Sequence, residues 1–180
     1  MNIYISKSGL HGKGIFAKKN IKKGEVIFII KGEKIEFLIN TKKQAHLAGF
    51  NWVGTGKSSW VDPINHCVFF NHSCDPNSVI KGRVTVIAYK DIKKDDEIVF
   101  DYSLNEADIF WHINCNCGTK KCRKVIRSIQ FLPTNIFKKH EYHISPYYKY
   151  IFKNFYFSKF INLKELQKKW VNYLEKDFSV

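Results

Sequence analysis

Three stretches of the chain combine residue types that can do chemistry. The first, residues 71–78, reads Asn-His-Ser-Cys-Asp-Pro-Asn-Ser and places an amide, an imidazole and a thiol beside a proline. The others are residues 97–102 and a cysteine cluster at 115–122. Asn, Asp and Ser compete for backbone hydrogen bonds and Pro removes a donor, so the first stretch is predicted to form a tight turn. We therefore expect one site built from three distant stretches.

With a fourth motif, these stretches make the chain resemble the SET-domain protein lysine methyltransferases. The motifs run in order: Gly-Lys-Gly-Ile-Phe-Ala at 12–17, Asn-His-Ser-Cys at 71–74, Asp-Glu-Ile-Val-Phe-Asp-Tyr at 96–102, and the post-SET run Cys-x-Cys-Gly-x3-Cys-Arg at 115–123. The compact length is similar to that of the small single-domain bacterial or viral members. The resemblance implies S-adenosylmethionine as cofactor and a protein lysine, on a histone or another basic protein, as substrate.

Methylation requires a neutral amine, and holding a lysine of pKa about 10.4 neutral at pH 7 costs roughly 4.6 kcal/mol. A narrow apolar channel and the positive sulfonium of the cofactor both lower that pKa. The resemblance implies that Tyr102 is the catalytic residue, orienting the amine for in-line attack. It also implies a substrate channel that includes Phe70, Phe100 and Ile30. Ile30 departs from the family pattern, because many relatives carry Tyr at this position.

Phe100 matches the family position at which Phe or Tyr sets the number of methyl groups added. A Tyr at this position holds an ordered water beside the amine, whereas Phe has no hydroxyl to hold it. The resemblance therefore predicts di- or trimethylation.

The glycine motif and the central turn are the expected cofactor site. Glycines allow a close approach of the backbone to a ligand, although a plain hairpin turn fits the same letters. The resemblance implies that S-adenosylmethionine contacts Lys13, Gly14, Asn71, His72 and Tyr102. In this scheme Asn71 meets the charged amino-acid end of the cofactor and His72 meets the adenine.

The cysteines indicate a metal site. Cys115, Cys117 and Cys122 supply three thiolates, and tetrahedral zinc needs a fourth ligand. The resemblance supplies Cys74 from the central turn, whereas His112 is an alternative that would make the module self-contained. Cys67 lies in an apolar run and is expected to be a buried small hydrophobe.

Short β-branched runs separated by Gly and Lys turns predict a mainly β (α+β) fold. Strands are expected at 3–5, 26–30, 34–39, 84–89 and 98–102, a short helix at 41–48 and a glycine-rich bend at 52–57. Helical spacing follows at 162–178, after an aromatic tract at 147–157, and Asn162 and Glu165 form a capping-box-like start. These two helices pack on the core or, alternatively, bind a partner.

The resemblance implies small curved sheets with a threaded pseudoknot. We divide the chain into a SET domain at 1–114, a post-SET zinc module at 115–130 and a C-terminal helical extension at 131–180.

The net charge of +14 is large for 180 residues. Of 30 basic residues only Arg83, Arg123 and Arg127 are arginines, so 27 are lysines, which suit diffuse attraction to an anionic partner such as nucleic acid or a nucleosome. Solubility alone is the competing explanation. The charge also supports a second function: a basic chromatin- or nucleic-acid-binding module that keeps the SET fold with weak or no catalysis.

No apolar stretch approaches the ~20 residues of a membrane span. The start of the sequence also lacks the pattern of a signal peptide. We therefore expect a soluble intracellular protein with no membrane partner, in the cytoplasm or, for a virus or intracellular pathogen, in the host nucleus.

Overall fold

Small antiparallel sheets form the first two thirds of the computed structural model, which describes residues 2–37, 39 and 51–176. The three larger sheets have the strand orders β1-β2-β9, β3-β8-β7 and β4-β6-β5, and β10 pairs with β11. The strands are Ile3–Lys7 (β1), Lys13–Ala17 (β2), Val26–Ile29 (β3), Gly32–Glu36 (β4), Val53–Gly56 (β5), Ser59–Pro63 (β6), Ser78–Lys81 (β7), Thr85–Ala88 (β8), Glu97–Ile98 (β9), His112–Asn114 (β10) and Val125–Arg127 (β11). Short 3₁₀ helices lie between strands at Asn65–Phe69 (η1) and Tyr102–Leu104 (η2), and a third follows β11 at Ile129–Phe131 (η3).

The glycine motif closes the β1–β2 hairpin. Ser8 Oγ accepts hydrogen bonds from the N–H groups of Leu10 and His11, and Gly12 has a φ of 51°, in the left-handed region that favours glycine. The glycine motif therefore does form a hairpin turn, which was the simpler interpretation of its sequence. Gly14 follows within β2.

One hydrophobic core lies among the three larger sheets. Its buried members come from strands β1, β2, β3, β7, β8 and β9 and from the segments that connect them: Ile3, Ile15, Ala17, Ile21, Ile27, Phe28, Ile30, Cys67, Phe70, Ile80, Val86, Ala88, Ile92, Ile98 and Phe100. Val53 and Val61 of the third sheet are partly buried against it. Because Phe70 and Phe100 belong to this core and also flank the chemical motifs, the sheets fix those motifs in place. Cys67 is buried, as expected.

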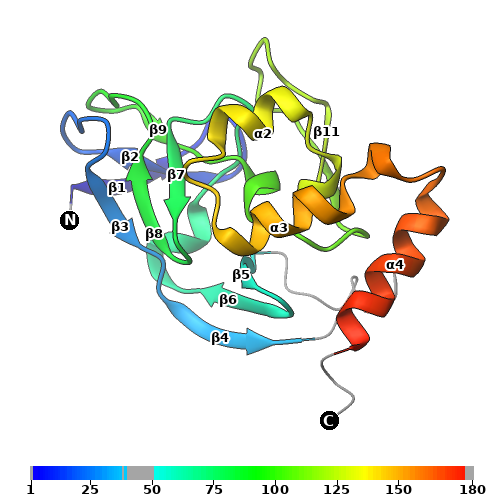
Figure 1. The fold of residues 1–180 in the computed structure, drawn as a ribbon. Helices are drawn as coiled ribbons and strands as arrows, with labels where there is room; N and C mark the ends of the chain where they lie inside the picture. Colours follow the sequence, from blue (N-terminus) through cyan, green and yellow to red (C-terminus); the bar gives the residue numbers. More distant parts are fainter. Residues whose placement is uncertain (1, 38, 40–50, 177–180) are drawn as a thin grey trace.

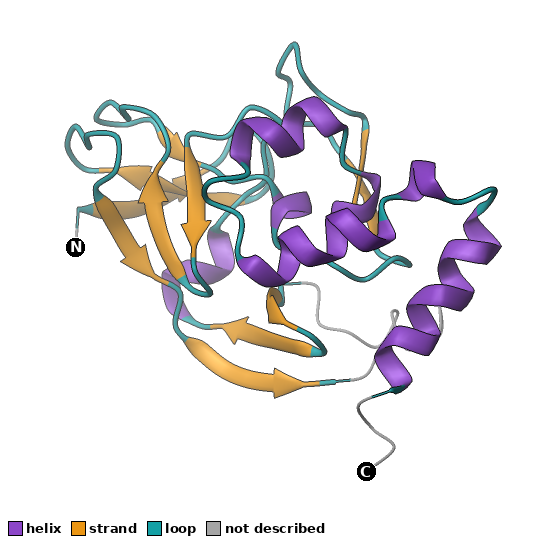
Figure 2. Cartoon of the chain, viewed as in Figure 1, coloured by secondary structure: helices purple, strands orange, loops and turns teal. Residues whose placement is uncertain are grey.

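The last third of the described chain is helical and forms a second core. The helices are Thr134–His140 (α2), Pro146–Phe155 (α3) and Leu163–Glu175 (α4), with a 3₁₀ turn at Phe157–Lys159 (η4). Figures 1 and 2 show α2 and α3 beside the sheets and α4 farther out. Phe155 packs edge to face on Trp170, with ring centroids 5.3 Å apart, which joins α3 to α4. The two helical segments predicted from the sequence thus pack within the fold, which was the first of the two alternatives.

The start of α4 follows the predicted capping chemistry. Asn162 Oδ1 accepts a hydrogen bond from the N–H of Glu165 at 3.0 Å, and Glu165 Oε2 accepts from the N–H of Ile161 at 2.8 Å. The reciprocal bond thus reaches one residue before the cap, a small departure from the usual capping box.

The prediction of a mainly β fold of small sheets followed by helices is confirmed, and three local expectations need comment. The strand expected at 98–102 is wrong, because β9 ends at Ile98 and the chain turns into η2 at Tyr102. The bend expected at 52–57 contains strand β5, and helix α2 was not predicted. The helix expected at 41–48 lies outside the described residues.

Among the described residues, none of the helices combines the length and the apolar character needed to span a bilayer.

Candidate active site

The central turn and the residues after β9 run side by side. His72 and Phe100 form a parallel bridge, in which Ser73 N donates to Phe100 O at 3.0 Å and Phe100 N donates to Asn71 O at 3.2 Å. Asn77 fastens the other end of the turn, since its Nδ2 donates to Glu97 O and its Oδ1 accepts from Val99 N. Two of the three predicted stretches are therefore locked together through the backbone.

Asn71 connects this turn to the glycine hairpin. Its Nδ2 donates to Lys13 O at 2.9 Å, to His11 O at 3.2 Å and to Glu97 Oε1 at 2.8 Å. All three hydrogen bonds are donated by the amide nitrogen of Asn71. Its Oδ1 accepts no hydrogen bond from the described part of the protein. Oδ1 is therefore the atom of Asn71 that can accept a hydrogen bond from the amino group of a cofactor.

Glu97 explains why residue 14 is glycine. A Cβ on Gly14 would lie 2.2 Å from Glu97 Oε1, which Ser8 and Asn71 hold in place by hydrogen bonds. The Lys13 side chain is exposed, with its Nζ 5.6 Å from the ring centroid of Phe69. Gly14 thus lets the carboxylate of Glu97 reach Asn71, a role that the sequence motif alone did not assign.

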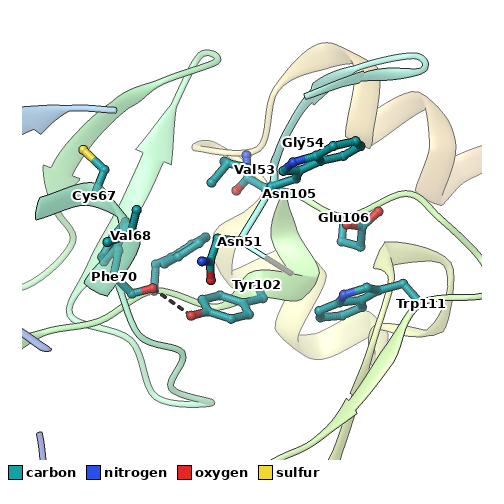
Figure 3. Close-up of a pocket in the computed structure, with 12 residues that line it drawn as sticks. Asn51, Val53, Gly54, Cys67, Val68, Phe70, Tyr102, Asn105, Glu106 and Trp111 are labelled. Atoms are coloured by element: carbon teal, nitrogen blue, oxygen red, sulfur yellow. Dashed lines mark hydrogen bonds between the residues drawn. The ribbon is translucent and has the colours of Figure 1, made fainter. Parts of the chain in front are cut away.

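Tyr102 stands at one wall of an aromatic cleft (Figure 3). Its hydroxyl donates to the carbonyl of Phe70 at 2.7 Å, and burial, with the charge of Glu97, raises its pKa above the usual value. The phenol is therefore neutral at pH 7 and acts as an oriented hydroxyl. The space of the cleft, with the open solvent at its mouth included, is about 530 Å³. The cleft is lined by Asn51, Trp52, Val53, Gly54, Cys67, Val68, Phe70, Phe100, Tyr102, Asn105, Glu106 and Trp111.

Two of the three predicted channel residues line the cleft and the third does not. Phe70 and Phe100 line the cleft and stack with ring centroids 4.2 Å apart, and Phe100 packs on Tyr102 at 4.7 Å. Ile30 is buried in the same core but is not among the residues that line the cleft. Trp111 and Glu106 line it without having been singled out from the sequence.

His72 connects the cleft with the cysteines. Tyr102 N donates to its Nδ1 at 3.2 Å, so Nε2 carries the proton and faces Cys74 Sγ at 3.3 Å. Burial lowers the pKa of His72 to about 4, so the ring is neutral. Both ring nitrogens thus have protein partners.

All four predicted cysteine ligands converge. The sulfurs of Cys74, Cys115, Cys117 and Cys122 lie within 4.8 Å of one another, and the Cys74 and Cys115 sulfurs are 3.7 Å apart. Tetrahedral zinc with bonds of about 2.3 Å requires sulfurs roughly 3.8 Å apart, so the donor set fits zinc. His112 is exposed on β10 and does not belong to this group.

A buried ion pair ties the cysteine module to the cleft. Arg123 donates from Nη1 to Asp101 Oδ2 at 2.7 Å and from Nη2 to Oδ1 at 2.6 Å. Arg123 N also approaches Cys74 Sγ at 3.4 Å. Asp101 is fully buried one residue before Tyr102, so this two-point pairing sets the position of the cysteine module relative to Tyr102.

A buried carboxyl pair, Glu106 and Asp108, begins at the wall of the cleft. Glu106 Oε1 accepts from Asp108 N at 2.7 Å, and Asp108 Oδ1 accepts from Phe110 N at 2.9 Å. Burial, with the nearby Asp108, raises the pKa of Glu106 to about 8, and burial also raises that of Asp108.

This pair predicts a dependence of stability on pH. Because its folded-state pKa is raised, Glu106 keeps its proton when folded, and its contribution to stability falls as pH rises from about 4.5 toward about 8. Glu106→Gln should therefore raise Tm relative to the parent protein by several °C at about pH 8.5 and much less at about pH 5. Exposed Glu33→Gln is the matched control in the same thermal scans. A Tm difference for Glu106→Gln that does not change with pH would contradict this.

Comparison with known proteins shows the family of this chain. The model of the SET domain family matches residues 12–103, or 92 of the 180 residues, and so includes the first three motifs. Human histone-lysine N-methyltransferase 2B is 29% identical over 139 residues, covering 68% of this chain and 5% of its own length. The chain thus spans a small part of this relative.

Two solved structures share the fold. The methyltransferase domain of human histone-lysine N-methyltransferase SETMAR has a TM-score of 0.55 at 24% identity, over 70% of this chain and 58% of that one. KRYPTONITE, solved with mCHH DNA, an H3(1-15) peptide and SAH, has a TM-score of 0.55 at 19% identity, over 69% of this chain and 29% of that one. Since the family model spans just over half of the sequence, the chain belongs to the SET-domain family.

Proposed function

We propose that this chain methylates lysine side chains of a histone or another basic protein, with S-adenosylmethionine as methyl donor. The observation that carries the proposal is the neutral Tyr102 hydroxyl, held against the carbonyl of Phe70 at the wall of an aromatic cleft. The name of the human relative, a histone-lysine N-methyltransferase, supports the reaction class. The H3 peptide held by KRYPTONITE is consistent with a histone substrate.

The cleft residues suit a lysine that must lose its charge. Phe70, Phe100 and Trp111 exclude water around the aliphatic stem, and desolvation disfavours the ammonium. Tyr102 orients the amine by its hydroxyl while Phe100 limits the tilt of its ring. The methyl group comes from the bound cofactor, which we place against Lys13, Gly14, Asn71 and His72, beside Tyr102.

We propose that zinc in the four-cysteine group holds the cysteine module beside the cleft. Cys74 belongs to the central turn and the other three ligands follow β10, so the metal would join two distant parts of the chain. Such thiolate sites persist in reducing compartments, which favours the cytoplasm or the nucleus as the place of action.

Phe100 should set how many methyl groups are added. Phe100 packs at 4.7 Å from Tyr102 and has no hydroxyl to hold a water beside the amine, so a methylated amine can turn and accept another methyl group. The parent protein is expected to give di- or trimethyllysine on a peptide substrate run to completion, and Phe100→Tyr should shift the product toward monomethyllysine. Mass spectrometry of the peptide measures both, and a parent product that stops at one methyl group would refute this role.

The rival function is a basic binding module with weak or no catalysis, which the net charge of +14 favours. Cofactor binding separates the two at low cost, because a ligand that binds only the folded state raises Tm. We expect S-adenosylmethionine to raise Tm and adenosine alone to raise it less. A Tm that does not respond to S-adenosylmethionine would favour the rival.

A further inference from the structure

A cluster of rings joins the helices to the sheets away from the cleft. Tyr89, just after β8, packs against His140 at the end of α2, with ring centroids 4.7 Å apart, and against His143 at 5.6 Å. The Tyr89 hydroxyl donates to Lys139 O at 3.4 Å, and Lys139 Nζ lies 5.7 Å from the Tyr89 ring. The Nδ1 atoms of both histidines are buried and have no hydrogen-bond partner within the described ranges.

Lysines from five separate segments lie near this cluster. Lys23, Lys81 and Lys149 are close enough to lower the pKa of His143 by their charge, after the larger effect of burial. Lys139 and Lys90 act in the same way on His140. We call these five lysines, with the three rings, the lysine face; they come from the turn before β3, the end of β7, the residues after β8, α2 and α3. The ring contact between Tyr89 and His140 places the end of α2 beside the residues that follow β8 (Figure 1).

Four carboxylates near the lysine face, on Asp75, Asp91, Asp101 and Glu141, are paired with basic side chains. Asp101 is the one carboxylate among the charges that shift the pKa values of these two imidazoles in the described chain, and it is bound to Arg123. Asp75 pairs with Lys90 and Lys121, and Asp91 pairs with Lys22. Within the described ranges, Lys81, Lys139 and Lys149 form no ion pair, so the face keeps a net positive charge.

We propose that the lysine face binds the phosphate backbone of double-stranded nucleic acid without reading its sequence. Lysine ammonium groups are flexible point charges that suit phosphates, and they lack the planar fork with which arginine recognises a base edge. Phosphate contacts position a protein on a duplex and release counterions, so such binding depends steeply on salt. This proposal does not rest on methyl transfer, because it can be tested without the cofactor.

The test is fluorescence anisotropy with a short labelled DNA duplex, measured over a series of salt concentrations. The triple variant Lys81→Gln, Lys139→Gln, Lys149→Gln is expected to bind at least about tenfold more weakly at low salt and to reduce the slope of log K against log salt by about 2.7. The matched control, Lys34→Gln, Lys164→Gln, Lys168→Gln, removes the same charge from exposed residues of β4 and α4 and should bind like the parent.

Equal losses in the two triple variants would show that the total charge, rather than this face, drives binding, and would overturn the proposal. Binding of polyglutamate in place of the duplex would identify an acidic protein as the partner and would also overturn it. Thermal scans check folding. If the triple variant is destabilised, the single variant Lys81→Gln, at an exposed strand end, should still reduce the salt slope by about 0.9.

Discussion

Tyr102→Phe is expected to lower kcat for methyl transfer by about 10²-fold or more and to leave the affinity for S-adenosylmethionine nearly unchanged. The ring would still pack on Phe100 and on His72, whose centroid is 5.2 Å away, so the cleft keeps its shape. Only the hydroxyl is lost, with its 2.7 Å bond to Phe70 O and its ability to orient the amine. Single-turnover rates with a lysine peptide, together with cofactor titration, measure the two effects separately.

Tyr142→Phe is the matched control for this substitution. Tyr142 is 85% exposed, so removing its hydroxyl should change neither the rate nor the affinity. Methyl transfer by Tyr102→Phe at the parent rate would rule out the proposed role of this hydroxyl.

The second large effect is expected from Cys74→Ser, which should lose most of the zinc and with it methyl transfer. Binding free energies of structural zinc sites are about 10–16 kcal/mol, and removing one of four thiolates weakens the site strongly. Cys74 is also the ligand that joins the central turn to the cysteine module, and its sulfur lies beside Arg123 N and His72 Nε2. Metal analysis of the purified protein gives the zinc content per chain.

His112→Ala is the informative comparison, because His112 is the alternative fourth ligand by sequence. It is exposed and outside the four-sulfur group, so this variant should keep one zinc per chain. Zinc retained in Cys74→Ser and lost in His112→Ala would reverse the assignment.

The ordered motifs carried most of the information about the site, because each contains residue types that a core would not use. They predicted that residues 71–74, 97–102 and the cysteine run meet, and the structure brings these stretches together. Their spacing could not show the hydrogen bonds made by Glu97 or the pairing of Asp101 with Arg123, since both join side chains far apart in sequence. The motifs Glu-x-x-x-Asp-Tyr and Cys-Arg contain Glu97, Asp101 and Arg123, so the sequence marked these residues but not the contacts that they make.

Local periodicity was less reliable where tertiary contacts decide the backbone. Residues 98–102 have the composition of a strand, but the carboxylate of Asp101 accepts a hydrogen bond from Ser103 N and begins η2. Helix α2 was missed because it is short and begins after Pro133 without a side-chain cap. The place of Glu106 in the wall of the cleft follows from the packing of residues 104–109 on the helices, which no sequence period encodes.

The most direct test of the central claim is mass spectrometry of lysine-containing substrates after incubation with the protein and isotopically labelled S-adenosylmethionine. Core histones, other basic proteins and the chain itself should be offered separately, with Tyr102→Phe as the inactive comparison. Labelled methyl groups on lysine Nζ, present with the parent protein and strongly reduced with Tyr102→Phe, are the predicted result. The account would be contradicted if zinc-loaded protein that binds the cofactor left every lysine unlabelled, or if the variant labelled lysines equally well.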